Sequence, residues 1–198
     1  KILTKNVFTS GEAALNSLQK NTYGKNFFHL GPERDNSLFL GFEKNKKNLE
    51  NADFILCTGF LDFNENSLNY YKHMLNGYTH LKMICTNPDL IVHRGSVQEY
   101  CAGTLAEIFK KMGGQVIYFG KPYPDIYKFC IQSNEKVLAI GDNIRTDIKG
   151  ANNMKFDSLF ITNGIHKNEF SDIPQESYDE IMEKYNTKTN YYQERLIW

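Results

Sequence analysis

Three short segments of the chain contain polar residues that could bind an anion and a cation together. They are T-N-P-D at 86–89, G-K-P at 120–122 and G-D-N-I-R-T-D at 141–147, and each follows a continuous apolar run. Ligands of open α/β sheets bind beyond the carboxyl ends of the strands. These residues are therefore the first candidates for a site.

Lys121 stands where a strand must stop. Gly120 lets the backbone turn without a Cβ, and Pro122 has no N–H for a ladder hydrogen bond, so Lys121 projects from the strand end. An ammonium group in that position can face an anion. Taken alone, G-K-P is better explained as a solvated lysine in a turn.

Asp142 follows four apolar residues and a glycine, where a carboxylate needs a cation. Asp147 falls near the first turn of a helix expected to begin about Arg145, where the positive helix end favours a carboxylate. Alone, Asp142 could equally form an Asx turn or cap, and Asp147 could be a simple N-terminal charge. Lys121 lies one predicted helix earlier in the chain. The combination predicts a phosphate-binding ammonium beside a Mg²⁺-binding carboxylate, delivered by neighbouring strand ends.

The elements that must position these residues alternate between strands and helices. Continuous apolar runs predict strands buried on both faces, and apolar residues at helical spacing predict one helix after each strand. This order predicts βαβ units and a mainly parallel sheet. A polar helix over 175–185 and a terminal segment, 191–198, that either docks as an edge strand or frays are also expected. The six predicted strands are Asn26–Leu30, Asp53–Cys57, Leu81–Cys85, Gln115–Phe119, Lys136–Ile140 and Asp157–Ile161.

The composition is that of a folded chain without a strong surface charge. Among 198 residues, 23 Lys and Arg balance 23 Asp and Glu, which argues against nucleic acid or an anionic membrane as the main partner. No apolar run is long enough to cross a bilayer, so we expect a soluble, cytoplasmic protein. The four cysteines form no C-x-x-C pair and are expected to be reduced core thiols.

At the segments described above the chain resembles the haloacid dehalogenase-like phosphohydrolases, and more narrowly their subfamily IIA, which has a large inserted α/β cap. Residues 8–14 look like the helix entry after the second motif of this group, and 86–89 match its T-N-P-D. G-K-P at 120–122 matches the third motif, and 141–151 match the fourth. The resemblance implies a Rossmann-like parallel-sheet core, incomplete at its N-terminus, with an inserted α/β cap.

The resemblance also implies roles and boundaries. Residues 22–114 would form the cap, and 1–21 with 115–198 the core. The substrate would be a small phosphorylated metabolite, whose identity the sequence leaves open. Because caps of this type often pair, a homodimer through the cap is one expectation. The implied catalytic residues are Lys121 and Asp147, the implied Mg²⁺ ligands are Asp142, Asn143 and Asp147, with Asp147 orienting metal-bound water or the lysine, and the implied substrate contacts are Thr86, Asn87, Asp89 and Lys121.

One signature of the family is missing. Its D-x-D motif supplies the aspartate that attacks phosphorus and a second acid/base aspartate, and no D-x-D occurs in this sequence, which begins with Lys1. The Thr or Ser of the second motif is missing before Thr9 as well. We therefore expect the printed chain to be part of a longer Mg²⁺-dependent phosphatase and to be inactive by itself. The alternative is a non-catalytic binding or scaffold protein of the same fold.

The histidines carry little of this interpretation. The five are dispersed, and their spacing to one another or to carboxylates indicates no metal or catalytic role. His93 and Arg94 follow Asp89 in the segment expected near the cap–core cleft, although a surface loop explains them more simply.

Overall fold

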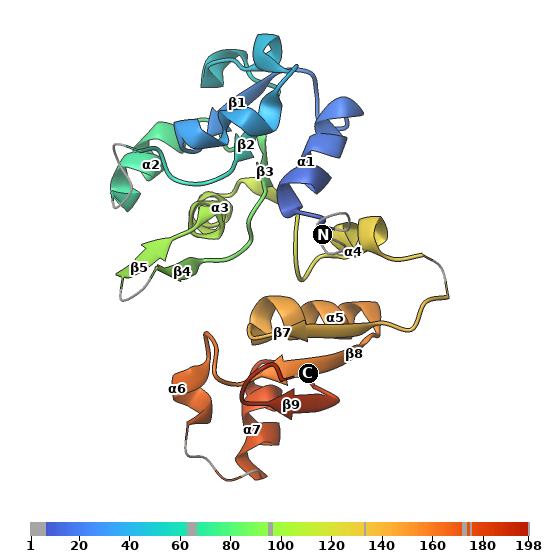
Figure 1. Cartoon of the computed structure of the whole chain (residues 1–198). Coiled ribbons are helices and arrows are strands. Elements are labelled where there is room, and N and C mark those ends of the chain that lie inside the picture. The colour runs from blue at the N-terminus through green and yellow to red at the C-terminus, as the bar shows by residue number, and fades with distance from the viewer. Residues whose placement is uncertain are drawn as a thin grey trace. The chain divides into compact units, whose positions relative to one another are not determined.

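The computed structural model describes residues 7–62, 67–94, 97–132, 134–171, 174 and 176–197. These residues form two compact units, a first unit that ends at Gly120 and a second unit that begins at Lys121 (Figure 1). Each unit contains parallel strands and helices, which confirms the predicted α/β class. None of the described helices has the length and apolar character needed to cross a membrane.

The first unit is built on a parallel four-stranded sheet with the order β1-β2-β3-β6. All four residues of β2 are buried, as expected for a central strand covered on both faces. These strands confirm four of the predicted apolar runs. Their bounds are β1 (Phe27–Leu30), β2 (Phe54–Cys57), β3 (Lys82–Cys85) and β6 (Gln115–Tyr118).

Two helices of the first unit enclose its main core. Both α2 (Leu68–Leu75) and α3 (Ala102–Lys111) follow predicted periodicities, and α3 packs on α2, β2, β3 and β6. Leu75, Leu105 and Phe109 are fully buried there, and each contributes about 1.5–3 kcal/mol by leaving water. The third helix, α1 (Ser10–Gln19), starts with a capping box between Thr9 and Glu12.

Two parts of the first unit differ from the sequence-based expectation. Instead of one helix, three short 3₁₀ helices connect β1 to β2, because this stretch buries only Phe39 in its longest helix and lacks a continuous apolar face. A hairpin of β4 (Ile91–Arg94) and β5 (Val97–Tyr100) was not predicted, because it contains no buried apolar run. The 3₁₀ helices are η2 (Glu33–Phe39), η3 (Glu43–Asn45) and η4 (Leu49–Asn51).

The second unit contains a parallel three-stranded sheet with the order β7-β8-β9. Strands β7 (Leu138–Gly141) and β8 (Asp157–Ile161) match predicted runs, and β9 (Tyr191–Gln193) shows that the terminal segment docks as an edge strand. Gln175 and Trp198, the ends of the two predicted terminal segments, lie outside the described residues. The helices are α4 (Pro124–Cys130), the π-helix η5 (Ile144–Ile148), α5 (Lys149–Met154), α6 (Lys167–Phe170) and α7 (Glu176–Lys184).

Strand β7 is exposed although its sequence is apolar. It is the end strand of its sheet in the described part of the chain, and Leu138 and Ile140 keep 47% and 38% of their surface exposed. The prediction that this run is buried on both faces is therefore wrong for the described residues. An exposed apolar edge is able to pair with a further strand.

The membership of the two sheets also corrects the predicted scaffold. Strand β6, which precedes Lys121, belongs to the sheet of the first unit, and β7, which precedes Asp142, to the sheet of the second. We had expected these strands to be neighbours in one sheet, and that prediction was wrong. The division into core 1–21, cap 22–114 and core 115–198 stays a prediction, and the boundary between the compact units follows Gly120.

The cysteines are only partly core residues. Cys57 and Cys85 are fully buried, and burial raises the pKa of both thiols, that of Cys85 to about 12. Cys101 is half-buried and Cys130 is exposed. All four are free in the structure, and the expected core position holds for two of them. The expected reduced state stays a prediction.

Candidate active site

Asp147 joins two of the predicted site residues within the second unit. One oxygen of its carboxylate contacts the Lys121 ammonium, and the other accepts a hydrogen bond from the backbone N–H of Asn143 at 3.1 Å. The carboxylate is buried, with 9% of the side chain exposed, whereas 53% of the Lys121 side chain is exposed. Asp147 thus engages one N–H of the Lys121 ammonium, and the remaining N–H donors can meet an anion from solvent.

The local sequence folds so that Asp147 must point toward Lys121. The Asn143 side chain caps η5 by accepting from the N–H of Arg145 at 2.9 Å, and the Asn143 carbonyl accepts from Asp147 and Ile148. Single π-turns of this kind are frequent at functional sites. A Cβ on Gly141 would stand 2.2 Å from the Asp147 Cγ, so only glycine leaves room for the carboxylate.

Asp142 lies directly after β7 and is exposed. Its Oδ2 accepts a hydrogen bond from the backbone N–H of Ile165 at 3.1 Å, and a Cβ on Gly164 would stand 2.2 Å from the same oxygen. Within the described ranges no lysine or arginine forms an ion pair with it. Asp142 is therefore a carboxylate held by backbone on one side and open to a cation on the other.

The donor set fits a hard divalent ion only in part. Among the described residues no group of three or more His, Cys, Asp or Glu side chains could hold a metal ion. Mg²⁺ commonly takes one or two carboxylates and completes its shell with water and phosphate oxygens. Asp142 suits that arrangement. Asp147 suits it less, because both of its oxygens already have partners, and the Asn143 side-chain oxygen serves the helix cap.

The predicted substrate contacts belong to the first unit. Thr86 is buried, and its hydroxyl donates to the Cys57 carbonyl at 3.3 Å, which indicates a structural role at the end of β3. Asn87 accepts from the N–H of Asp89 at 3.1 Å. Asn87 and Asp89 line a cavity of about 300 Å³, together with Arg34 and residues that follow β1 and β2. These roles stay predictions. His93 and Arg94 lie in β4.

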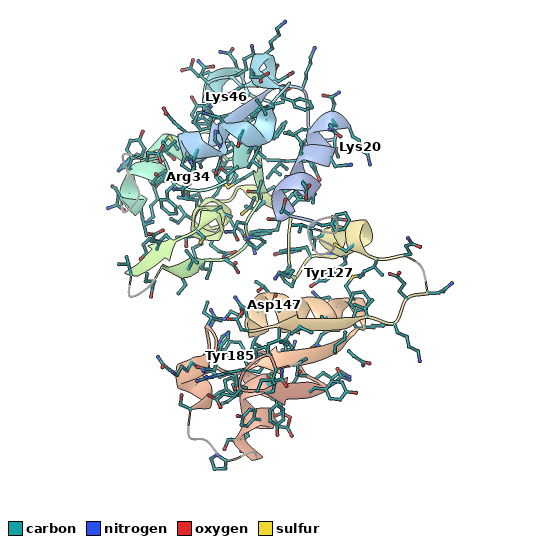
Figure 2. The ribbon with its side chains drawn as sticks, in the orientation of Figure 1. Lys20, Arg34, Lys46, Tyr127, Asp147 and Tyr185 are labelled. Carbon is teal, nitrogen blue, oxygen red and sulfur yellow. The ribbon has the colours of Figure 1, made fainter. Side chains whose placement is uncertain are left out.

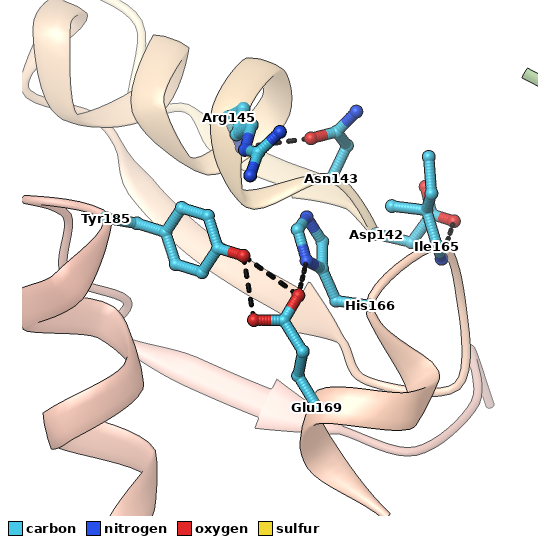
Figure 3. A network of polar contacts seen from close by, with 7 residues as sticks. All are labelled: Asp142, Asn143, Arg145, Ile165, His166, Glu169 and Tyr185. Carbon is cyan, nitrogen blue, oxygen red and sulfur yellow. Dashed lines mark hydrogen bonds and ion pairs between the residues drawn. The ribbon is translucent and has the colours of Figure 1, made fainter. Parts of the chain in front are cut away.

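Sequence analysis missed a polar cluster beside Asp142 (Figure 3). His166 is 8% exposed, and its Nδ1 lies 2.7 Å from Glu169 Oε1, while the Tyr185 hydroxyl donates to both Glu169 oxygens at 2.8 and 2.7 Å. The Arg145 guanidinium lies 5.2 Å from the centre of the Tyr185 ring. The i,i+3 spacing of His166 and Glu169 on one helical turn was the available signal, and the sequence analysis passed over it.

Charge and burial compete at this cluster. Burial by itself raises the pKa of Glu169, but the hydrogen bonds from His166 and Tyr185 outweigh it and leave the pKa below its ordinary value. The pKa of Tyr185 is raised, first by burial and then by its hydrogen bond to the Glu169 carboxylate. At neutral pH the cluster therefore contains an ionised Glu169 that accepts from a protonated Tyr185.

Comparison with known proteins shows similarity to one group of hydrolases. Residues 118–187 match the HAD-hydrolase-like family model. Over 120 residues the chain is 27% identical to the ribonucleotide monophosphatase NagD of Escherichia coli K12, which covers 58% of this chain and 46% of that relative. A hydrolase of the haloacid dehalogenase-like family from Brucella suis 1330 has a TM-score of 0.76 at 26% identity, over 96% of this chain and 72% of that one. Over residues 118–187 the chain therefore matches the haloacid dehalogenase-like hydrolases.

Other solved structures share the fold of this chain. The p-nitrophenyl phosphatase from Archaeoglobus fulgidus has a TM-score of 0.70 at 16% identity, over 93% of this chain and 69% of that one. The 4-nitrophenylphosphatase from Thermotoga maritima has a TM-score of 0.67 at 22% identity, over 94% and 69%. The chain spans about half the length of the curated relatives it matches.

Proposed function

We propose that this chain contributes the phosphate- and metal-binding half of a Mg²⁺-dependent phosphomonoesterase of subfamily IIA. The observation that carries the proposal is the Asp147 carboxylate, which links the Lys121 ammonium to the Asn143 backbone directly after Asp142. The Lys121 ammonium, held by Asp147, and the nearby Asp142 carboxylate can serve the same phosphoryl group. The phosphatases among its relatives support this assignment.

Each residue has a separate task in this proposal. Lys121 offsets the negative charge of the phosphoryl group, and Asp147 fixes the direction of the lysine. Asp142 would hold Mg²⁺, while Asn143 caps the helix that begins beside it, so the metal role expected for Asn143 stays a prediction. When bound, the ion reduces charge repulsion between a carboxylate nucleophile and the phosphate. Asp147 is thereby assigned to the lysine and not to the ion, because its two oxygens are engaged.

The nucleophile has to come from outside the 198 residues, since they contain no D-x-D. In the reaction we propose, an aspartate oxygen bonds to phosphorus as the bond from phosphorus to the alcohol oxygen breaks, and the second aspartate of the D-x-D motif gives its proton to that oxygen. The same second aspartate then takes a proton from water, which attacks the acyl phosphate and releases inorganic phosphate and the free nucleophile. The exposed edge of β7 supports a place for the strand that carries this aspartate, because Asp142 follows β7 directly.

The substrate is proposed only as a small phosphomonoester. In the first unit, Arg34, Asn87 and Asp89 line a cavity with both a cationic and an anionic side chain, which suits the polar part of a metabolite. A homodimer through the predicted cap and a cytoplasmic location stay predictions.

Binding and turnover should be measured separately. We expect inorganic phosphate, titrated calorimetrically into the 198-residue chain, to bind at least tenfold more tightly with Mg²⁺ than without it. Asp142→Asn should remove the effect of Mg²⁺, and Lys121→Met should weaken phosphate binding with or without the ion. Lys128 and Asp125 form an exposed ion pair on α4, so Lys128→Met and Asp125→Asn are matched controls that should bind like wild type.

Turnover then decides between an enzyme and a binding protein. With Mg²⁺, the printed chain should release no phosphate from p-nitrophenyl phosphate, whereas a natural product that also contains a D-x-D strand should release it. A product with D-x-D that binds phosphate and Mg²⁺ without turnover favours the non-catalytic alternative. Equal phosphate binding in wild type and Lys121→Met would remove the proposed site altogether.

A further inference from the structure

Two segments that contact or follow Asp142 come together at Tyr185. Asp142 accepts from the N–H of Ile165, and the next residue, His166, is buried against Glu169. After Asp142 in the chain, the backbone N–H of Arg145 donates a hydrogen bond to the Asn143 side chain. The guanidinium of Arg145 lies over the ring of Tyr185. Figure 3 shows the Tyr185 hydroxyl between these groups, directed at the Glu169 carboxylate.

We propose that the cluster of His166, Glu169 and Tyr185 is a clamp that fixes the direction of the Asp142 carboxylate toward a divalent cation. The proposal rests on the metal role of Asp142 given above. The three clamp residues act through the loop 162–166 and are positioning residues, because they contact one another and the rings and helices around them.

The need for a clamp follows from exposure. Both Asp142 and Ile165 are exposed, so the hydrogen bond between them competes with water and contributes little order by itself. The loop also contains Gly164, whose backbone freedom must be removed before the bond can form. Buried contacts of the adjacent His166 can remove it. The His166 ring lies 5.3 Å from the Tyr185 ring and 6.4 Å from the Phe160 ring, centre to centre.

The clamp is strong because its hydrogen bonds are charge-assisted. Glu169 accepts from Tyr185 with both oxygens, and the His166 Nδ1–H completes the set when the ring carries its proton there. The loop 162–166 also lies close against Asp142, because a Cβ on Gly164 would overlap the Asp142 side chain. A shift of the loop therefore moves the carboxylate as well.

The test uses Mn²⁺ as the probe, with free Mn²⁺ counted by electron paramagnetic resonance. Tyr185→Phe keeps the ring under Arg145 and deletes the hydroxyl. Outer-shell groups of metal sites are worth about 10–100-fold in affinity, so we expect Mn²⁺ to bind about tenfold more weakly. The amide of Ile165 should also exchange its hydrogen faster, measured without metal, and the midpoint of thermal unfolding should stay within a few degrees of wild type.

A matched control and a rescue separate positioning from general stability. Tyr118 donates to Glu107 at 2.8 Å in the first unit, so Tyr118→Phe deletes the same kind of bond and should leave Mn²⁺ affinity and Ile165 exchange unchanged. His166→Ala should weaken Mn²⁺ binding, and His166→Asn should restore it, because the amide Nδ2 of asparagine can donate from the place of Nδ1.

The outcomes distinguish the clamp from the proposed function. If the wild type binds Mn²⁺ and Tyr185→Phe binds it equally well with unchanged Ile165 exchange, the clamp is wrong and the metal site stands. If the wild type binds no Mn²⁺, the metal role of Asp142 is overturned, and the clamp proposal fails with it. Weakened binding in Tyr118→Phe to the same degree as in Tyr185→Phe would also contradict the clamp.

Discussion

Asp147 contacts the Lys121 ammonium with one carboxylate oxygen and accepts the Asn143 N–H with the other. An amide cannot replace a carboxylate in this position. Its NH₂ group must face either the ammonium or the N–H, and both are donors. The Asp147 carboxylate is buried, so replacing one of its acceptor oxygens with an NH₂ donor leaves two donors facing each other and lowers the stability of the folded chain.

We therefore expect Asp147→Asn to lower the free energy of unfolding by about 1–3 kcal/mol, the usual effect of a buried donor without an acceptor. Urea unfolding followed by circular dichroism measures it. Asp125 pairs with Lys128 in an exposed i,i+3 contact, so Asp125→Asn should change the same quantity by less than about 0.5 kcal/mol. Similar losses in the two variants would show that the Asp147 contacts carry no special weight.

Gly141→Ala tests the space that the Asp147 carboxylate occupies. The added Cβ would stand 2.2–2.4 Å from Asp147 atoms, so the carboxylate must move and release Lys121. Overpacking of this kind costs about 1–3 kcal/mol in unfolding free energy, and phosphate binding should fall with it. Gly11 in α1 is the control, because its new Cβ would meet only ordinary contacts from 3.5 Å outward. Gly11→Ala should be neutral or stabilise the chain by up to about 1 kcal/mol.

The sequence predicted those parts of the fold that depend on local pattern. Strands β1, β2, β3, β6, β7 and β8 lie within two residues of the predicted runs, because a continuous apolar run has few other places in a compact domain. The hairpin β4–β5 has no such run and was missed. Which strands share a sheet depends on contacts distant in sequence, and the local pattern of β6 and β7 contains no information about it.

The same distinction applies to the candidate site. The family resemblance implied that Asp147 orients metal-bound water or the lysine, and Asp147 contacts Lys121. The expectation that neighbouring strands of one sheet deliver the site was wrong. Tyr185 could not be found, since 16 residues separate it from Glu169 and its role depends on where α7 ends. His166 offered a local signal through Glu169, but a single i,i+3 pair is also common on solvated helices.

Tyr127 presents a hydroxyl that is costly to bury. Its Oη is buried and has no hydrogen-bond partner among the described residues, and burial followed by the charge of Asp147 raises the Tyr127 pKa to about 12 (Figure 2). Removal of an unsatisfied hydroxyl leaves packing intact, so Tyr127→Phe should leave the unfolding free energy unchanged or raise it. Tyr118→Phe, which loses a 2.8 Å bond to Glu107, should instead lower it by about 0.5–1.5 kcal/mol. Destabilisation by Tyr127→Phe beyond that range would reveal a partner for the hydroxyl.

The stability of the first unit should depend on the protonation of His29. This side chain is 5% exposed and pairs with the Thr58 hydroxyl at 2.9 Å, and burial, assisted by the charge of Lys46, lowers its pKa from 6.5 to about 4. The unfolded chain therefore binds a proton that the folded chain rejects between pH 6.5 and 4. The contribution of neutral His29 to the free energy of unfolding is therefore complete above pH 6.5. It falls by up to about 3 kcal/mol as the pH falls toward 4.

Urea midpoints measured at pH 7 and pH 4.5 test this dependence by comparison with a variant. Carboxylates also titrate in this range, so the informative quantity is the difference between wild type and His29→Gln, which keeps a polar group near Thr58 but has no ionisable ring. We expect His29→Gln to lose less stability on acidification than wild type by about 2–3 kcal/mol. His80 is exposed, with its ring nitrogen against the Gly77 carbonyl, so His80→Gln should follow the wild-type curve. Parallel curves for wild type and His29→Gln would mean that His29 accepts a proton in the folded state.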